Sequence, residues 1–310
     1  MTLICAAALF CQLSAAVSSP MTHPATDDSL RARIERRIAE VAGATAGVAF
    51  RDLSRNDTLY IGADERFHAA STMKVPVMIE LFRRLERGQI SLSQSITLKN
   101  EFSSIVDGTP YSLDASDDSD SLVYRWIGTA VSIHDLLEHM ITRSSNLATN
   151  TLIGLVGAAK ANATAHELGA KDIQVLRGVE DDKAYAAGMN NTTTARDLAV
   201  LMAAIETGKA ASPASTDSMR AVLSRQEFND EIPAGLPPGT RVAHKTGQIT
   251  GHLHDAAIVY PQGRGPYVLV VLTRGILDEK VARSLIADIS RLVYEHAMRS
   301  GSAAAARGDR

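Results

Sequence analysis

Apolar residues recur at helical spacing at both ends of the chain and through its middle. Near the N-terminus, Leu30, Ile34, Ile38 and Val41 fall on one helical face, and Ser29 before them is a good helix cap. A closing amphipathic helix is indicated by Val281, Leu285, Ile289, Leu292 and Val293. Four more helical stretches are predicted over residues 75–85, 133–141, 147–156 and 195–205. The middle of the chain is therefore expected to be mostly helical.

Short segments rich in β-branched residues predict strands instead. Residues 46–52 and 58–61 flank the polar turn 54–57, which favours a hairpin. Three more strands are expected near the far end, over residues 241–246, 256–260 and 267–272. Both groups can share one sheet. We therefore expect an α/β fold of the α+β type, with an antiparallel sheet of about five strands, a helix from each terminus beside it, and an all-helical lobe.

This pattern predicts one two-lobed domain over residues 28–298. The sheet lobe is expected over about 28–70 and 210–298, and the helical lobe over about 71–209. A cleft between two lobes commonly binds a small molecule. The segment 299–310 is small and polar, so we expect a disordered tail there.

The first twenty residues carry no charge and contain a short apolar run that ends in small residues. This pattern is typical of a secretory signal peptide over residues 1–20, and the run is too short to span a membrane. We therefore expect a secreted, periplasmic protein with no stable membrane insertion after processing. Cys5 and Cys11 both lie in this leader, so the mature chain is expected to have no disulfide and no thiol nucleophile.

Composition narrows the classes of function. The chain has 310 residues, of which 45% are apolar and 22% charged, which is typical of a globular protein with a sizeable core. Its formal net charge is -3. Partners such as nucleic acid or an anionic membrane require clustered Lys and Arg, so we expect neither.

Four aspartates among serines, Asp114, Asp117, Asp118 and Asp120, raise the question of a calcium loop. The segment lacks the central Gly and the terminal Glu at the spacing of such a loop. We therefore interpret it as a solvated surface insertion.

Three histidines, His68, His252 and His254, together with Asp255, raise the question of a metal site. Their spacing matches no known zinc motif, so we interpret them as polar packing residues near the sheet. We expect no metal and no other cofactor.

Three polar clusters follow one another along the chain: Ser71-Thr72-Met73-Lys74, then Ser144-Ser145-Asn146, then Lys245-Thr246-Gly247. Each alone has a simpler interpretation. The first is compatible with a capped helix and an exposed lysine, the second with a helix cap, and the third with a surface strand. Their order and spacing together describe an acyl-transfer site.

The first cluster supplies a nucleophile and a neighbouring base. Ser71 is expected at the start of a helix, and Lys74 lies three residues later on the same side, so the two side chains can touch. A serine hydroxyl needs a group that takes its proton, and a lysine amine does so when burial or nearby positive charge lowers its pKa. Lys245 can supply that charge. The helix start offers N–H groups and a favourable dipole for an oxyanion.

The other clusters supply proton relay and substrate contacts. Ser144 is expected to relay a proton to a leaving nitrogen, and Asn146 to hold a substrate amide while fixing Lys74. Thr246 and Lys245 lie on a predicted strand. Gly247 leaves room for substrate along the strand edge, and the Gln248 N–H is a candidate second oxyanion donor.

Arg274 follows a predicted strand and is a further candidate. The forked donors of arginine suit a substrate carboxylate, which Arg274 would bind together with Thr246 and Lys245. A strand-end arginine is equally common as a surface residue, and both interpretations stay open.

In this order, S-x-x-K, S-x-N and K-T-G resemble the serine beta-lactamase and penicillin-binding protein superfamily, specifically the class A beta-lactamases. The resemblance covers residues 28–298 and includes residues 71–76 and 192–198. It implies a serine hydrolase that acts on small-molecule beta-lactams. We expect a monomer.

The resemblance also implies a glutamate that activates the water for hydrolysis of the acyl-enzyme. Glu180, 36 residues after Ser144, is the candidate. The family normally has Asn four residues after this Glu, whereas this chain has Ala184. Possible substitutes as the partner of the water are Asp182, Asn190 and Asn191. The alternative for Glu180 is a solvated acidic loop.

Two questions stay open at this point. Either Lys74 or Glu180 can be the base for acylation. The leading function is a serine beta-lactamase, and the alternatives are a D-alanyl-D-alanine peptidase or other serine hydrolase with slow deacylation, or a non-catalytic penicillin-binding sensor. No G-x-S-x-G elbow is present that would indicate an ordinary esterase.

Overall fold

The computed structural model describes residues 29–55 and 57–308, with side chains to residue 299. Helix α1 (Leu30–Ala39) begins after Ser29, whose Oγ accepts a hydrogen bond from the Ala32 N–H at 3.3 Å. The predicted hairpin is confirmed as strands β1 (Thr45–Asp52) and β2 (Thr58–Ile61). The leader, with Cys5 and Cys11, lies outside the described residues.

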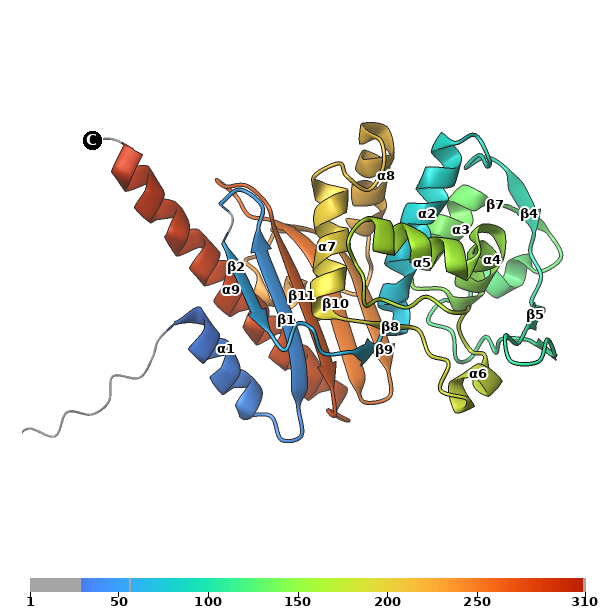
Figure 1. The fold of residues 1–310 in the computed structure, drawn as a ribbon, viewed down its shortest axis with the longest axis horizontal. Helices are drawn as coiled ribbons and strands as arrows, with labels where there is room; N and C mark the ends of the chain where they lie inside the picture. Colours follow the sequence, from blue (N-terminus) through green and yellow to red (C-terminus); the bar gives the residue numbers. More distant parts are fainter. Residues whose placement is uncertain (1–28, 56, 309–310) are drawn as a thin grey trace, which may run out of the picture.

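The central sheet has five antiparallel strands in the order β2-β1-β11-β10-β9 (Figure 1). Its C-terminal strands are β9 (Arg241–Ile249), β10 (His252–Tyr260) and β11 (Tyr267–Arg274). β1 pairs with β11 in the register Thr45↔Arg274. The first and last parts of the chain therefore share one sheet, as predicted, and β9 lies at the sheet edge.

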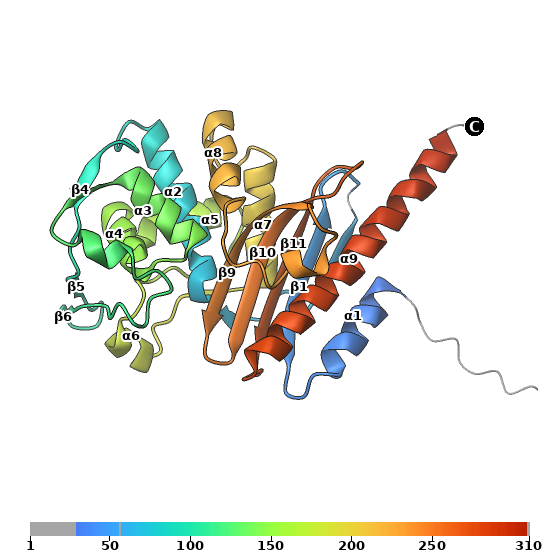
Figure 2. The same ribbon diagram turned by 180° about the vertical axis from the view of Figure 1, so that it is seen from behind.

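Each face of the sheet is covered by helices (Figures 1 and 2). Alternate residues of a strand point to opposite faces, so Val48 and Phe50 pack with α1 and the last helix, α9 (Glu279–Gly308). Ala49 points to the other face, where α7 (Ala195–Glu206) and the helical lobe lie. The predicted α+β fold is confirmed.

The helical lobe begins with a 3-10 turn, η1 (Ala70–Met73), that continues into α2 (Lys74–Glu86). The other helices are α3 (Ile133–Thr142), α4 (Asn146–Val156), α5 (Ala158–Glu167), α6 (Asp182–Ala186) and α8 (Pro213–Leu223). Two further 3-10 turns are η2 (Val123–Trp126), which lies before α3, and η3 (Pro233–Gly235), which lies between α8 and β9. Short two-stranded pairs join β3 (Phe67–His68) to β8 (Thr192–Thr193), β4 (Ser95–Thr97) to β7 (Ala130–Ser132), and β5 (Phe102–Ser103) to β6 (Pro110–Tyr111).

Three helices were not predicted from the apolar pattern. α5 is rich in alanine and has little contrast between its faces, and α6 is a short segment. α8 carries a readable start, because Ser212 caps it and Pro213 occupies the first turn. These local signals are weaker than an amphipathic stripe.

The prediction of a disordered tail is wrong for residues 299–308. α9 continues through residue 308, so the backbone of 299–308 is helical. The run Ala303–Ala306 has high helix propensity and extends a helix that is already formed. Among the described residues, no helix combines the length and the apolar character needed to cross a bilayer.

Candidate active site

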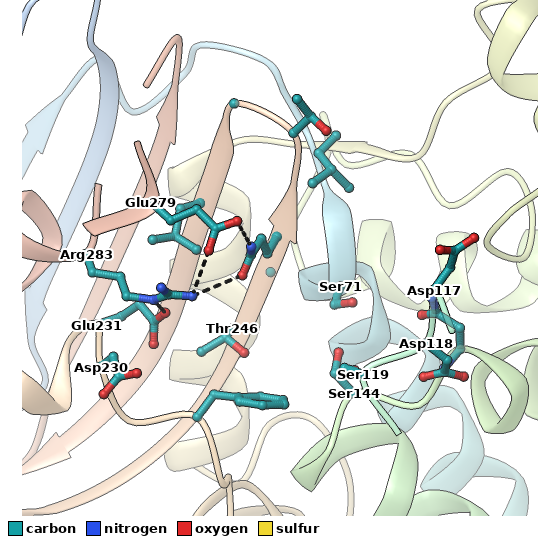
Figure 3. Close-up of a pocket in the computed structure, with 18 of the residues that line it drawn as sticks. Ser71, Asp117, Asp118, Ser119, Ser144, Asp230, Glu231, Thr246, Glu279 and Arg283 are labelled. Atoms are coloured by element: carbon teal, nitrogen blue, oxygen red, sulfur yellow. Dashed lines mark hydrogen bonds and ion pairs between the residues drawn. The ribbon is translucent and has the colours of Figure 1, made fainter. Parts of the chain in front are cut away.

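The three sequence clusters meet at one cleft, between the edge strand β9 and the helical lobe. A space of about 580 Å³ is lined by Ser71, Ser144, Asn146, Glu180 and Thr246, among others (Figure 3). The residues come from η1, the α3–α4 junction, the loop before α6, and β9. The predicted site residues are thus brought together by elements that lie far apart in sequence.

Ser71 lies on the η1 turn, which is held in an unusual backbone conformation. Ala70, just before it, has φ 44°, and the Ala70 N–H donates to His68 Nδ1 at 3.1 Å. Residues other than glycine rarely adopt a positive φ, and such strain is common at functional sites. The strained residue precedes the candidate nucleophile.

Gly247 lines the cleft and also has a packing role. A Cβ at this position would lie 3.1 Å from Thr72 N and 3.2 Å from Ser71 N. The absent side chain therefore lets the η1 turn rest directly against β9. The predicted role beside the substrate stays a prediction.

Lys74 is fully buried at the start of α2. Its Nζ donates to Ser144 Oγ and Asn146 Oδ1, each at 3.1 Å, and to the Ser144 carbonyl. Burial lowers the pKa of Lys74 to about 7, and the negative charges of Asp118 and Glu180 oppose this shift. The predicted contact with Asn146 is present. No hydrogen bond between Lys74 and Ser71 occurs in the described structure.

Lys245 is the second fully buried amine, and it extends from β9. Its Nζ donates to Ser144 Oγ at 3.0 Å and to the Thr246 carbonyl at 2.9 Å. Burial, and then the charge of Lys74, hold the pKa of Lys245 well below its usual value. The Ser144 hydroxyl, on a residue with φ 60°, therefore lies between two amines. That position suits a proton relay.

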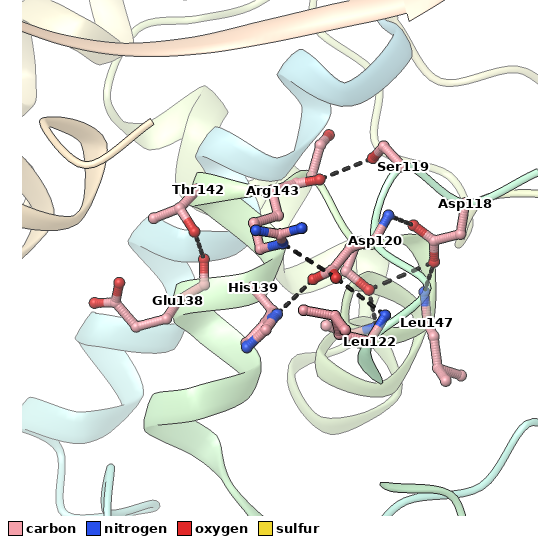
Figure 4. Close-up of polar contacts among 12 residues, drawn as sticks. Asp118, Ser119, Asp120, Leu122, Glu138, His139, Thr142, Arg143 and Leu147 are labelled. Atoms are coloured by element: carbon pink, nitrogen blue, oxygen red, sulfur yellow. Dashed lines mark hydrogen bonds and ion pairs between the residues drawn. The ribbon is translucent and has the colours of Figure 1, made fainter. Parts of the chain in front are cut away.

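The interpretation of the acidic segment as a solvated surface insertion is wrong for Asp118, whose side chain is buried. Its Oδ2 accepts hydrogen bonds from the N–H groups of Asn146 (2.8 Å) and Leu147 (3.0 Å) at the start of α4 (Figure 4). A carboxylate at a helix N-terminus satisfies free N–H groups and complements the dipole. Asp118 thus positions the S-x-N segment from another part of the chain.

Asp120 anchors the same insertion to α3 (Figure 4). This buried carboxylate contacts His139 Nδ1 and lies 3.2 Å from the Arg143 guanidinium. Asp114 and Asp117 remain exposed, as expected of a surface segment. The insertion is therefore partly a structural support of the site.

Glu180 lies across the cleft on the loop before α6, with φ 58°. Its Oε1 accepts a hydrogen bond from Asn146 Nδ2 at 3.2 Å. Partial burial of the carboxyl, followed by the charges of Asp182 and Asp117, raises the pKa of Glu180. Asn146 thus links Glu180 to Lys74.

The loop of Glu180 is fixed on both sides of this residue. Asn150 on α4 accepts from the Val179 N–H at 2.6 Å and donates to the Val179 carbonyl at 3.0 Å. A Cβ at Gly178 would lie only 2.4 Å from the Asn150 side chain, so glycine is required there. Asp181 caps α6 and accepts from Ser104 Oγ at 2.9 Å.

Two suggested partners of the hydrolytic water have other uses. Asn190 Oδ1 accepts from Arg177 at 3.1 Å, and Asn191 hydrogen-bonds the backbone of Arg177, so both close the base of the loop. Ala184 is buried in α6. Asp182 and Asn191 both line a second space beside Glu180 and Ser71, but the Asn191 side chain is already bonded to backbone groups, so Asp182 is the suggested substitute whose position fits.

Arg274 is not brought to the substrate side of the cleft, contrary to the substrate-binding interpretation. Its guanidinium donates to Glu65 Oε2 at 2.7 Å and to the Arg66 carbonyl at 3.0 Å. It does not line the cleft that contains Thr246. The ion pair turns this strand-end arginine toward the surface segment before β3.

The three histidines gather around β3 and β10. The ring of His254 is buried, accepts from the Thr273 N–H and contacts the His68 carbonyl at 2.9 Å through Nε2. Among the described residues, no group of three or more His, Cys, Asp or Glu side chains has an arrangement that could hold a metal ion. Sequence analysis named Asp118 but did not predict its supporting role, because no local motif marks a buried carboxylate in this segment.

The profile of the Beta-lactamase enzyme family matches residues 29–297. The chain therefore belongs to the beta-lactamase enzyme family. The resemblance inferred from the three motifs is confirmed. Beta-lactamase AST-1 of Nocardia asteroides is 28% identical over 305 residues, which cover 94% of each chain.

Solved structures give the same result for the fold of this beta-lactamase family member. An ancestral class A beta-lactamase has a TM-score of 0.76 at 26% identity, covering 86% of this chain and 100% of that one. A PBP-A mutant in an acyl-enzyme complex with penicillin-G also has a TM-score of 0.76, at 30% identity, covering 87% and 96%. Solved structures with this fold thus include beta-lactamases and a protein acylated by penicillin-G.

Proposed function

We propose that this protein is a class A-like serine beta-lactamase that hydrolyses the lactam amide through an acyl-enzyme on Ser71. The observation that carries the proposal is the Ser144 hydroxyl, held at 3.1 Å and 3.0 Å by the buried amines of Lys74 and Lys245 beside Ser71. This arrangement supplies a nucleophile, a base and a proton relay in one space.

In acylation, Ser71 Oγ attacks the lactam carbonyl carbon. Neutral Lys74 takes the hydroxyl proton, which its pKa of about 7 permits near neutral pH. Catalytic hydrogen bonds often tighten only when substrate binds, so the missing Ser71–Lys74 bond does not oppose this role. The N–H groups of Ser71 and Gln248 stabilise the oxyanion. Ser144 then donates its proton to the nitrogen as the C–N bond breaks, and takes in exchange the proton that Lys74 received from Ser71, so Lys74 is neutral again.

Substrate binding uses Asn146 and Thr246, which line the cleft, and Lys245, which is buried beside Thr246. Asn146 holds the substrate amide, while Lys245 and Thr246 bind the carboxylate next to the lactam nitrogen. Gly247 keeps η1 and β9 close enough for these groups to act on one molecule. No metal or cofactor takes part in the proposed steps.

Deacylation completes the cycle. Glu180 takes a proton from water as the water oxygen attacks the ester carbonyl, and Ser71 leaves with a proton returned to its oxygen. The position of Asp182 suits a second contact to this water. A second candidate, a penicillin-binding protein with slow deacylation, is favoured by Ala184 and by the similarity to PBP-A.

We further propose that the protein is exported to the periplasm as a monomer after removal of residues 1–20, where it contributes to beta-lactam resistance. The uncharged apolar leader supports export. N-terminal sequencing of protein recovered from the periplasm tests the processing, and size-exclusion chromatography tests the monomer.

The function is tested by mixing purified protein with a chromogenic cephalosporin and following product beyond one equivalent. Sustained turnover supports hydrolysis, and a single-equivalent burst supports the binding protein. Ser71→Ala is expected to reduce turnover by about 10,000-fold and to give no covalent adduct by mass spectrometry. Absence of both turnover and an adduct on wild-type Ser71 would defeat both candidates.

A further inference from the structure

One wall of the cleft carries a carboxyl group that the proposed mechanism does not use. Glu231 precedes β9 and lines the cleft near Thr246 (Figure 3). Its side chain is only 4% exposed, and its Oε2 has no hydrogen-bond partner in the described structure. Burying a polar oxygen without a partner is costly. Glu231 therefore keeps an unused, buried acceptor in the wall of the cleft.

The nearest cation, Arg283 of α9, is already occupied by acidic partners. Its Nε lies 3.4 Å from Glu231 Oε1, and its Nη2 lies 3.2 Å from Glu279 Oε2. The same Nη2 donates to Gln248 Oε1 at 3.3 Å. The charge of the one guanidinium is thus offset by its two acidic partners. This wall therefore does not offer net positive charge to an anionic substituent.

Acidic residues outnumber basic ones over the whole lining of the cleft. Arg283 is the one cation among its lining residues in the described chain, and six carboxyl groups surround it. These carboxyl groups belong to Asp117, Asp118, Glu180, Asp230, Glu231 and Glu279. A cleft lined by one sign of charge raises the local concentration of ligands with the opposite sign. A cationic substrate group is therefore favoured over an anionic one.

The position of this wall indicates which part of a substrate reaches it. Thr246 and Lys245 bind the substrate carboxylate in the proposed mechanism, and Glu231 lines the cleft near Thr246. In a cephalosporin, the 3-substituent is bonded to the ring carbon next to the one that carries the carboxylate. That substituent therefore lies near the acceptor of Glu231 when the carboxylate is bound.

We propose that Glu231 is a specificity residue that accepts a hydrogen bond from a cationic group, a primary ammonium or guanidinium, on the 3-substituent of a beta-lactam substrate. This inference rests on the proposed function, because it needs a substrate bound at Ser71. It names the substrate class that the acidic wall selects.

The inference has a pH signature. Burial, and next the charge of Asp255, raise the pKa of Glu231 to about 7, while Arg283 and His244 oppose the shift. Glu279 and Asp230 also line this wall. Glu231 is neutral below this pKa and anionic above it, so the preference for a cation grows as pH rises through about 7.

The test uses two cephalosporins with the same acyl side chain, one with a 3-substituent that ends in a primary ammonium and one that ends in a hydroxyl. We expect kcat/KM of wild-type protein at pH 8 to be about tenfold higher for the ammonium compound, as for a charge-assisted hydrogen bond. The ratio should fall from pH 8 to pH 6. Titration of Lys74 affects both substrates, so it cancels in the ratio.

The Glu231→Gln variant should bring the ratio to about one and remove its pH dependence. Glu295→Gln is the matched control, because Glu295 lies on α9 but pairs with Arg33 outside the cleft, and it should keep the wild-type ratio. If Glu231→Gln does not fold, the wild-type pH dependence decides. A ratio near one, or one that rises at low pH, overturns this inference alone. Failure of both compounds to acylate Ser71 overturns the proposed function with it.

Discussion

Two regions of the site are built in contrasting ways. Lys74, Ser144 and Lys245 form a buried cluster whose polar groups bond one another, on elements that also form the core. Glu180 instead lies on an exposed loop, held by Asn146 and by the anchors of the loop. The groups proposed for acylation are thus fixed by the fold itself. The group proposed for deacylation is added from a segment that can change without disturbing the core.

This contrast explains how one fold can serve both hydrolases and penicillin-binding proteins. Loss of a buried amine would leave the other polar groups of the cluster unsatisfied, at a cost of about 1–3 kcal/mol for each group. A change at Glu180 leaves no buried group without a partner. The rate of deacylation is therefore the property that can change most easily among proteins with this fold.

Among variants that separate the two regions, the largest effect is expected from Glu180→Gln, which removes the proposed base but keeps the shape of the side chain. Deacylation should slow by about 1,000-fold while acylation continues, so an adduct accumulates on Ser71. Mass spectrometry and stopped-flow turnover measure the two steps. Asp182→Asn should slow deacylation less, because Asp182 only supports the water. Unchanged hydrolysis in Glu180→Gln would show that another group is the base.

Gly247→Ala is expected to affect the buried region and not the loop. The new Cβ would lie within 3.2 Å of two backbone nitrogens of η1, so the turn that carries Ser71 must shift. A displacement of a catalytic group by about 1 Å can cost about 100-fold, and acylation should slow by that order. Gly154→Ala on α4 is the control, because a Cβ there meets nothing within 4 Å. Equal acylation rates in the two variants would contradict this account.

Asp118→Asn tests the support of the buried cluster. Asp118 opposes the lowering of the Lys74 pKa, so its removal should lower that pKa further below about 7. Neutral Lys74 is the base, and kcat/KM falls as pH drops through its pKa. The acidic limb of the acylation profile should therefore move to lower pH, with about a tenfold loss of kcat/KM as α4 loses its capping charge.

The control for this variant is Asp114→Asn, an exposed aspartate of the same insertion that bonds Ser116. It should leave the acidic limb where it is in the wild type. A limb that moves equally in both variants would point to a general effect of surface charge.

Sequence reasoning found the residues whose chemistry depends on local motifs. Ser71 and Lys74 are three residues apart, and the order and spacing of the three clusters together indicate the roles of these residues and of Lys245. Asp118 was misjudged because its partners, the N–H groups of Asn146 and Leu147, are 28 and 29 residues away. An acidic serine-rich segment gives no local sign that one carboxylate is buried.

The fold was predictable for a related reason. Strands β1 and β11 are apolar over most of their lengths, and α1 and α9 have wide apolar faces. α5 and α6 were missed because their packing depends on small residues and loop contacts. The hydrophobic pattern therefore predicts the layers of the fold. The direction of a single side chain at a strand end, such as that of Arg274, is instead set by tertiary contacts.

Arg274→Gln should have the smallest effect, and it tests that last point. The Arg274–Glu65 ion pair is exposed, so its loss should cost less than about 1 kcal/mol of unfolding free energy. Since Arg274 does not line the cleft, KM for a beta-lactam should change by less than about twofold. Thermal unfolding and initial rates measure both quantities. A large rise in KM with unchanged stability would mean that Arg274 leaves Glu65 when substrate binds, and would restore it to the carboxylate site beside Thr246.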